Sequence, residues 1–319
     1  MYPPVSGIRR PSSLEVPAVS IEPITQNNIE AVWNLYQRTV AECDQLPLDW
    51  FRYKILDDPD HDPETCLVSM ESGKPVAFMD AVCRTWEEGP TGWLKAWATD
   101  PDWRGKGVAT ELLNRAETRF RALGASKVKA GMAKPHYYTP GIDPAVYTSA
   151  IAFLLRRGFK NAGFAYNMDV PLTGRAFLAP EHARRAADQG IIARRVEQSE
   201  KDRVVAWVQE AGWGYSWQYQ AGASIDADPS AAFIAEKDGG IVGFAVYDAV
   251  RPGWFGPTGT LESMRGTGIG SVLFLMCLDD MRDRGHDVCH ICSVGPLYFY
   301  AKVGGALVSR TFWHMAKDL

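Results

Sequence analysis

The sequence lacks long apolar runs, and this absence limits the classes of protein it can encode. No stretch of about 18 consecutive apolar residues occurs, so no segment is predicted to span a membrane. An excess of one charge is also missing, because 34 basic and 38 acidic residues give a formal net charge of −4. That balance argues against nucleic acid as a partner. Residues 1–17 lack the apolar core of a signal peptide and are expected to form a flexible tail.

Cysteine is sparse, and its spacing is not that of a disulfide framework. The six cysteines are scattered along the chain, which favours a reducing, cytoplasmic location. His286, Cys289, His290 and Cys292 include the residue types of a zinc site. Residues three apart on a strand point to opposite faces, however, so Cys289 and Cys292 are not expected to converge. The sequence therefore predicts no metal.

A glycine-rich turn is present twice, at 104–109 (RGKGVA) and 265–270 (RGTGIG). Each copy follows a strand-like run and precedes an apolar helical pattern. Glycines let successive backbone N–H groups converge, and the following helix adds its positive dipole end, so a phosphate is the natural ligand. A tight turn without a ligand is the alternative, which the repetition disfavours. The P-loop and Rossmann glycine patterns are absent from both copies.

Both turns fit the pattern R-x-x-G-x-G/A, which resembles the acetyl-CoA pyrophosphate loop of the Gcn5-related (GNAT) N-acetyltransferases. The second family signature, A-x-x-F-Y-x-x-x-G-F, is matched at 296–305, although Pro296 and Gly305 depart from it. It is matched again at 150–159, where Leu154 replaces the tyrosine. The resemblance covers most of the chain. It implies an α/β fold with mixed sheets, made of two tandem GNAT-like domains and similar in layout to mycothiol synthase.

Periodicity predicts the same order of elements in both halves. We expect an N-terminal domain at 18–172, a linker at 173–189 and a C-terminal domain at 190–319. In the first domain, strands are expected near 18–24, 64–71, 74–86, 91–99, 127–132 and 163–170, with helices near 27–41, 47–57, 105–123 and 146–157. In the second, strands are expected near 190–196, 231–237, 240–250, 255–261, 287–293 and 306–317, with helices near 199–211, 267–284 and 296–303.

The resemblance also implies residues that bind acetyl-CoA. In the first half they are Trp97, Thr99, Arg104, Gly105, Lys106, Gly107, Val108, Ala109 and Thr110. In the second half they are Thr258, Thr260, Arg265, Gly266, Thr267, Gly268, Ile269, Gly270 and Ser271, together with Ser293, which stands where the family often has asparagine.

Tyr300 is the candidate catalytic residue. The resemblance assigns its position to a general acid that protonates the departing thiolate, and a phenol is protonated at neutral pH. Packing on an amphipathic helix is the alternative role. A base or a chain of water molecules must deprotonate the acceptor amine, and Glu262 and Glu236 are the acidic candidates.

The two halves are not expected to be equivalent. Leu154 cannot donate a proton, so the first half has the turn without the acid unless Tyr147 or Tyr138 substitutes. Tandem members of the family are known in which the C-terminal half is active and the N-terminal half binds cofactor without turnover. The same division is expected here, with the N-terminal half serving cofactor binding or structure.

Two further segments have open interpretations. Trp213, Tyr215 and Trp217 either pack against the core or form a platform for the acceptor. The Pro- and Gly-containing loop at 133–144 is either functional or, as we favour, packing between the halves. The predicted function is transfer of an acetyl group to a primary amine of a small molecule, with a non-catalytic acyl-CoA sensor or scaffold as the alternative. A monomer or a homodimer is expected.

Overall fold

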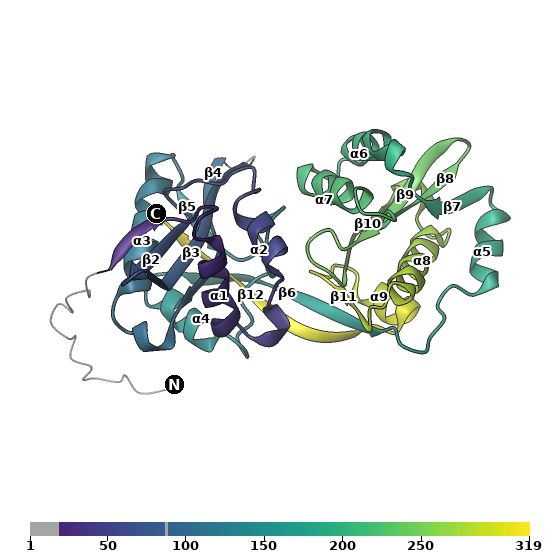
Figure 1. Cartoon of the computed structure of the whole chain (residues 1–319). Coiled ribbons are helices and arrows are strands. Elements are labelled where there is room, and N and C mark those ends of the chain that lie inside the picture. Colours follow the sequence, from purple (N-terminus) through teal and green to yellow (C-terminus); the bar gives the residue numbers. More distant parts are fainter. Residues whose placement is uncertain (1–18, 87–88) are drawn as a thin grey trace, which may run out of the picture. The chain divides into compact units, whose positions relative to one another are not determined.

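The computed structural model describes residues 19–86 and 89–319, so the expected N-terminal tail at 1–17 lies outside the described residues. The described chain forms two compact units (Figure 1). The first contains residues up to Lys129 together with Lys317–Leu319, and the second contains Ala130–Ala316. The expected domain boundaries follow the sequence repeat and stay a prediction, because a repeat and a compact unit need not share limits.

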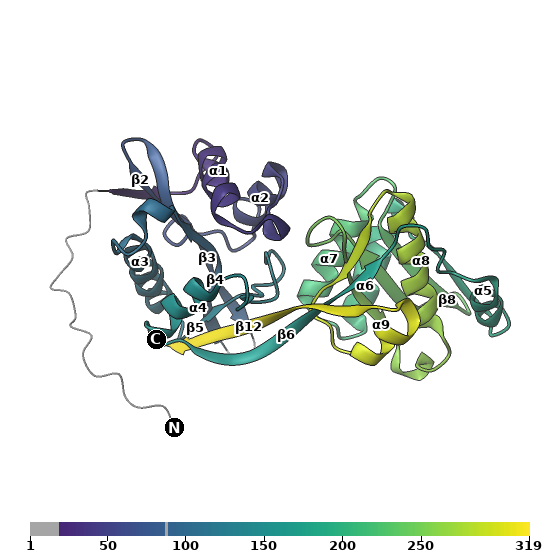
Figure 2. The ribbon, with the colours of Figure 1, turned by 90° about the horizontal axis from the view of Figure 1, so that it is seen from below.

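The first unit is a mixed α/β layer structure with strands in the order β1-β2-β3-β4-β5. Helices α1 and α2 cover one face of this sheet and α3 covers the other (Figure 2). The strands are β1 (Ser20–Pro23), β2 (Leu67–Glu71), β3 (Lys74–Trp86), β4 (Gly89–Thr99) and β5 (Lys127–Ala130). The helices are α1 (Ile29–Thr39), α2 (Leu48–Ile55) and α3 (Val108–Ala122), with short 3-10 helices η1 (Glu42–Asp44) and η2 (Pro101–Trp103).

The second unit contains a sheet with strands in the order β12-β6-β11-β10-β9-β8-β7. Its strands are β6 (Lys160–Pro171), β7 (Ile191–Arg195), β8 (Ala232–Lys237), β9 (Gly240–Tyr247), β10 (Trp254–Thr260), β11 (Val288–Ile291) and β12 (Leu307–Asp318). The end of β12 beyond Ala316 belongs to the first unit. Its helices are α4 (Thr148–Leu155), α5 (Pro180–Ala187), α6 (Lys201–Glu210), α7 (Tyr215–Ile225), α8 (Ile269–Asp283) and α9 (Leu297–Gly304), with 3-10 helices η3 (Gln198–Glu200) and η4 (Glu262–Met264).

Strand β6 comes from the first half of the sequence but pairs with two strands of the second half. It runs antiparallel to β11 on one side and to β12 on the other. Both views show the long strands β6 and β12 side by side (Figures 1 and 2). A strand expected to complete the first half therefore completes the sheet that contains β7–β11.

Alternating side chains place two core clusters of the second unit on opposite faces of its sheet. On β8, Phe233 belongs to the cluster that packs with α8, and the next residue, Ile234, belongs to the cluster that packs with α6 and α7. Successive strand side chains point to opposite faces, so this alternation places helices on both faces of the sheet. The sheet is thereby held rigidly between two apolar layers.

The strands and helices expected from periodicity are present, most within about three residues of their predicted ends. Two α-helices were not predicted: α5, which lies in the expected linker, and α7, which contains Tyr215 and Trp217. In the part of the chain that the structure describes, no helix is long and apolar enough to cross a membrane.

Candidate functional site

The two glycine-rich turns have the same backbone geometry. In the first, Gly105 and Gly107 have φ of 74° and 86°, and α3 begins at the next residue. In the second, Gly266 and Gly268 have φ of 81° and 95°, and α8 begins at the next residue. These left-handed conformations favour glycine strongly. The repeat seen in the sequence is thus a repeat in structure.

Backbone N–H groups of both turns have no partner among the residues that the structure describes. The N–H groups of residues 266–271 make no hydrogen bond to any described residue, and those of 105–109 make none either. Unpaired N–H groups at the start of a helix form a site for an anion, and the helix dipole adds to the attraction. The turns therefore fit a phosphate or pyrophosphate group.

A cavity of about 840 Å³ begins at the turn of the second unit. It occupies the space where β10 and β11 diverge, since these parallel strands pair only at Trp254↔His290 and Phe255↔Ile291. A bulge at Gly256 and Pro257 then carries β10 away. The predicted residues that line this cavity are Trp213, Trp217, Thr258, Thr260, Arg265, Gly266, Gly268, Ile269, Gly270, Ser271, Ser293 and Tyr300.

The expected linker contributes to the end of this cavity beside the turn. Arg185 of α5 lines it, and a Cβ built on Gly268 would lie 3.9 Å from Arg185 Nε. A second hollow beside the turn, lined by Arg185, Thr267 and Lys302, continues this basic surface. Arg185 and Lys302 were not predicted as site residues, since their segments gave no motif. Their charges suit the phosphates of a nucleotide.

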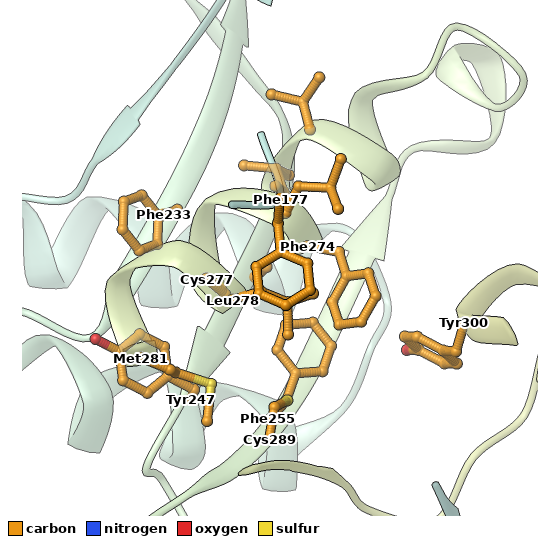
Figure 3. Packing of buried hydrophobic residues seen from close by; sticks show 14 of the residues in the cluster. Phe177, Phe233, Tyr247, Phe255, Phe274, Cys277, Leu278, Met281, Cys289 and Tyr300 are labelled. Carbon is orange, nitrogen blue, oxygen red and sulfur yellow. The ribbon is translucent and has the colours of Figure 1, made fainter. Parts of the chain in front are cut away.

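Tyr300 lies where the hydrophobic core meets the cavity wall. Its ring packs against Phe255, Phe274 and Phe299, with ring centroids 6.1, 5.2 and 5.0 Å away. Figure 3 shows it at the edge of this cluster. Tyr300 is 6% exposed, and its hydroxyl makes no hydrogen bond to any described residue. Burial raises the pKa of the phenol above its ordinary value, so the proton is retained at neutral pH.

The aromatic segment at the start of α7 divides into wall and surface residues. Trp213 lies against β10, because a Cβ on Gly259 would come within 2.6 Å of its ring. Trp213 also stacks on Phe244 with centroids 5.2 Å apart, and Trp217 packs beside it. Both tryptophans line the cavity, so they pack against the core and also face the cavity. Tyr215 is 53% exposed and does not line it.

The loop at 133–144 is fixed at two points and contributes to the cavity. His136 Nε2 lies 2.7 Å from the hydroxyl of Tyr219 on α7, and Tyr137 OH lies 3.3 Å from Cys292 Sγ. Lys134, between these anchors and Met132, lines the cavity together with Tyr137. The expectation of packing between halves covers only part of this role, and neither Lys134 nor Tyr137 was identified from the sequence.

The acidic candidates for a base lie outside the cavity. The side chain of Glu262 is 88% exposed and its carboxylate lies 3.3 Å from Arg265. Glu236 is paired with Arg194 and Arg203, and although burial opposes it, these hydrogen bonds lower the pKa of its carboxyl. Neither carboxylate lines the cavity, so the geometry gives no support to a role as base.

The histidines and cysteines near β11 have separate surroundings. His290 Nδ1 lies 2.9 Å from Asp169, and His286 Nε2 lies 3.3 Å from Asp248. Cys289 is fully buried. Among the described residues, no group of His, Cys, Asp and Glu side chains is arranged to hold a metal ion.

The first unit has the same turn, but the bulge in its neighbouring strand contains a buried lysine instead of a glycine. Arg104 Nε donates to the carbonyl of Thr99 at 3.2 Å, and Lys106 lies 4.7 Å from the centroid of the Trp103 ring. In β4 the bulge falls at Lys95, whose Nζ lies 2.6 Å from Asp58 and 3.3 Å from Asp80. The remaining predicted residues stand on β4 (Trp97, Thr99) and on the turn and first residues of α3 (Gly105, Gly107, Val108, Ala109, Thr110).

Comparisons with known proteins agree with this architecture. The profile of the Acetyltransferase (GNAT) family matches residues 29–139 and 196–304. Among solved structures, a GCN5-related glucosamine N-acetyltransferase region of a fungal multi-domain GH3 β-N-acetylglucosaminidase is similar, with a TM-score of 0.78, 18% identity and 94% of this chain covered. This chain spans 38% of that fungal protein. No match was found among curated protein sequences.

Two further structures match over nearly their whole length. A GCN5-related N-acetyltransferase from Sphaerobacter thermophilus has a TM-score of 0.65 and 19% identity, with 94% of this chain and 95% of that chain covered. A tandem GNAT protein from the clavulanic acid biosynthesis pathway has a TM-score of 0.65 and 13% identity, with 94% and 98% covered. At these identities the likeness shows the fold alone.

The repeated turns, the diverging strands and the cavity define a protein with two tandem acyltransferase-type domains. The chain belongs to the acetyltransferase (GNAT) family, because the family profile matches more than half of it, once in each half. The family binds acyl-CoA, and its fold supports transfer of the acyl group.

Proposed function

We propose that the protein transfers an acetyl group from acetyl-CoA to the primary amine of a small molecule, by direct attack of the neutral amine in the cavity of the second unit. The observation that carries this proposal is the cavity itself. It connects the unpaired N–H groups of the turn with the indole rings of Trp213 and Trp217, and Tyr300 lies on its wall. Binding both substrates in one cavity supplies proximity.

The difference between the two strand bulges supports catalysis in the second half. Lys95 and Gly256 each precede the arginine of their turn by nine residues, and each lies in a bulge. Gly256 lines the open cavity, whereas Lys95 is fully buried with Asp58 and Asp80. The signature position is also unequal, since Leu154 is buried and has no proton to donate. The first half accordingly serves cofactor binding or structure.

Each residue of the cavity has a proposed part. The N–H groups of residues 266–271, with Arg185 and Arg265, would hold the pyrophosphate of acetyl-CoA, and Thr258, Thr260 and Ser293 would border its pantetheine arm. Bound acetyl-CoA would supply the activated acyl carbon and the thiolate leaving group. Tyr300 would donate its phenolic proton to the departing thiolate sulfur, and the phenolate left behind would regain a proton from solvent.

No described residue that lines the cavity is a carboxylate, so water is the proposed acceptor of the amine proton. The apolar wall formed by Phe255, Ile291 and Phe299 would keep bulk water away from the thioester.

Mass-spectrometric detection of acetylated product tests the proposal directly. The full chain and acetyl-CoA would be mixed with a panel of aminosugars, polyamines, amino acids and peptides. An acetylated compound, absent without the protein, is the expected result. Acetyl-CoA binding without any product would favour the non-catalytic sensor or scaffold.

A further inference from the structure

The charged side chains described in the cavity wall are all basic. The described side chains that line it include Lys134, Arg185 and Arg265, and none of them is an aspartate or a glutamate. Arg185 and Arg265 stand at the turn, where phosphates are expected. Lys134 has a different place, next to Tyr137 and within electrostatic range of Cys292. Tyr137 and Cys292 pack with Trp254 at the start of β10, the end of that strand farther from the turn.

Lys134 is held in place, and no described residue pairs with its charge. Its ammonium makes no hydrogen bond or ion pair with any residue that the structure describes, although the side chain is half-buried. The backbone N–H of Lys134 donates to the carbonyl of Met132 at 2.8 Å, and the contact of His136 with Tyr219 fixes the loop on its other side. Burial lowers the pKa of this ammonium, and Cys292 offsets part of that effect. A partly desolvated cation without a counter-ion is unfavourable, and a bound anion would remove that cost.

Neighbouring polar groups on the same wall are also unpaired. The indole N–H groups of Trp213 and Trp217 make no hydrogen bond to any described residue. The side-chain amide of buried Gln220 donates to Ser216 at 3.1 Å, and its amide oxygen has no described partner. The two indole N–H groups and the Lys134 ammonium are therefore donors that a ligand could use. A ligand that brings an anionic group would satisfy them, and the Gln220 oxygen could accept from its amine.

We infer that the acceptor amine carries an anionic group, a carboxylate or a phosphate, which binds to Lys134. This inference rests on the proposed function, because it names the class of acceptor for the same cavity. Polyamines and other polycations are poor acceptors on this view, since no carboxylate of the described cavity wall pairs with their charges and Lys134 repels them.

Binding of matched pairs to the full chain, saturated with CoA, tests the inference without turnover. The pairs are phenylalanine and phenethylamine, glucosamine 6-phosphate and glucosamine, and phosphoethanolamine and ethanolamine. Calorimetry or tryptophan fluorescence measures each affinity, and the carboxylate and phosphate arms identify the anion. We expect the anionic compound of at least one pair to bind about 10-fold or more tightly than the compound that lacks the carboxylate or phosphate.

Three variants assign that preference to Lys134. Lys134→Met is expected to weaken binding of the anionic member about 10- to 100-fold while its partner changes less than about 3-fold. Lys134→Arg keeps the charge and is expected to retain most of the preference. Lys160→Met makes the same charge change at an exposed position of β6 and is expected to have no effect.

The outcomes separate this inference from the proposed function. If no anionic member binds more tightly than its partner, or if Lys134→Met weakens both equally, the inference is overturned. If an anionic member binds through Lys134 and no compound of the panel is acetylated, the anion site at Lys134 stands and the proposed acetyl transfer fails.

Discussion

Replacing Tyr300 by phenylalanine removes one oxygen atom from the cavity wall, and its two effects can be worked out separately. The ring contacts with Phe255, Phe274 and Phe299 are unchanged by the substitution. The lost hydroxyl has no described hydrogen-bond partner, so no buried group is left unsatisfied. The free energy of unfolding is therefore expected to change by less than about 0.5 kcal/mol.

Turnover is expected to respond very differently. A positioned general acid contributes roughly 10²- to 10⁴-fold to a rate, so kcat of Tyr300→Phe should fall by at least about 100-fold, or about 2.7 kcal/mol in activation free energy. KM for acetyl-CoA should stay within about 3-fold, because the turn that holds the phosphates is intact. Burial raises the pKa of this phenol, so deprotonation of Tyr300 should not limit wild-type kcat between pH 7 and about 10.

The assay follows CoA thiol release with an acceptor identified from the panel, alongside urea unfolding of each variant. Tyr166→Phe is the matched control, since Tyr166 is 37% exposed on β6 and does not line the cavity. An unchanged kcat in a stably folded Tyr300→Phe protein would refute the role of general acid. A protein that is destabilised by several kcal/mol would show that the hydroxyl has a structural role instead.

Two further predictions concern the turns and acid stability. Gly268→Ala and Gly107→Ala each place a side chain at a left-handed backbone position, so each should lower the free energy of unfolding by about 1 kcal/mol. Only Gly268→Ala should strongly slow turnover of acetyl-CoA. Steady-state kinetics showing the reverse would assign catalysis to the first half. Burial opposes the charge on Asp280, but hydrogen bonds from Arg195 outweigh this effect and lower the pKa of the Asp280 carboxyl. The charged carboxylate therefore stabilises the fold above about pH 4, and this stabilisation is lost as the pH falls through the pKa of Asp280 in the folded protein. Urea unfolding between pH 7 and pH 3 should show a smaller loss of stability in Asp280→Asn than in the wild type, and parallel curves for the two proteins would contradict this.

The sequence carried more information about local structure than about the assembled site. The turns at 104–109 and 265–270 were predicted with their strands and helices, because glycine at positive φ and apolar periodicity are local properties. Tyr300, which the family signature indicated, lies on the cavity wall, and its catalytic role stays a prediction. Strand β6 was expected with the strands of the first half but pairs with β11 and β12, because strand pairing depends on contacts distant in sequence that no pattern within 160–171 records.

The parts of the site that sequence reasoning missed come from segments without a motif. Lys134 lies in a loop that periodicity marks only as irregular, and Arg185 lies in a helix within an apparent linker. Both residues line the cavity because of contacts between segments distant in sequence. His136 contacts Tyr219 on α7, and Arg185 of α5 lies beside Gly268 of the turn. A single sequence contains no periodic signal for such contacts.

The distribution of these segments bears on how the repeat diverged. Both halves keep the turn, which requires only glycines and a helix start, and both keep a bulge at the same distance from it. Around the second turn, the loop at 133–144 and the helix α5 add the charged side chains Lys134 and Arg185, and both segments precede the second repeat in sequence. Around the first bulge, Lys95 is fully buried with Asp58, and removing one member of such a pair leaves an uncompensated charge. In the first half, the buried pair of Lys95 and Asp58 thus limits which residues the bulge can contain. The loop at 133–144, also from the first half of the sequence, lines the cavity of the second unit.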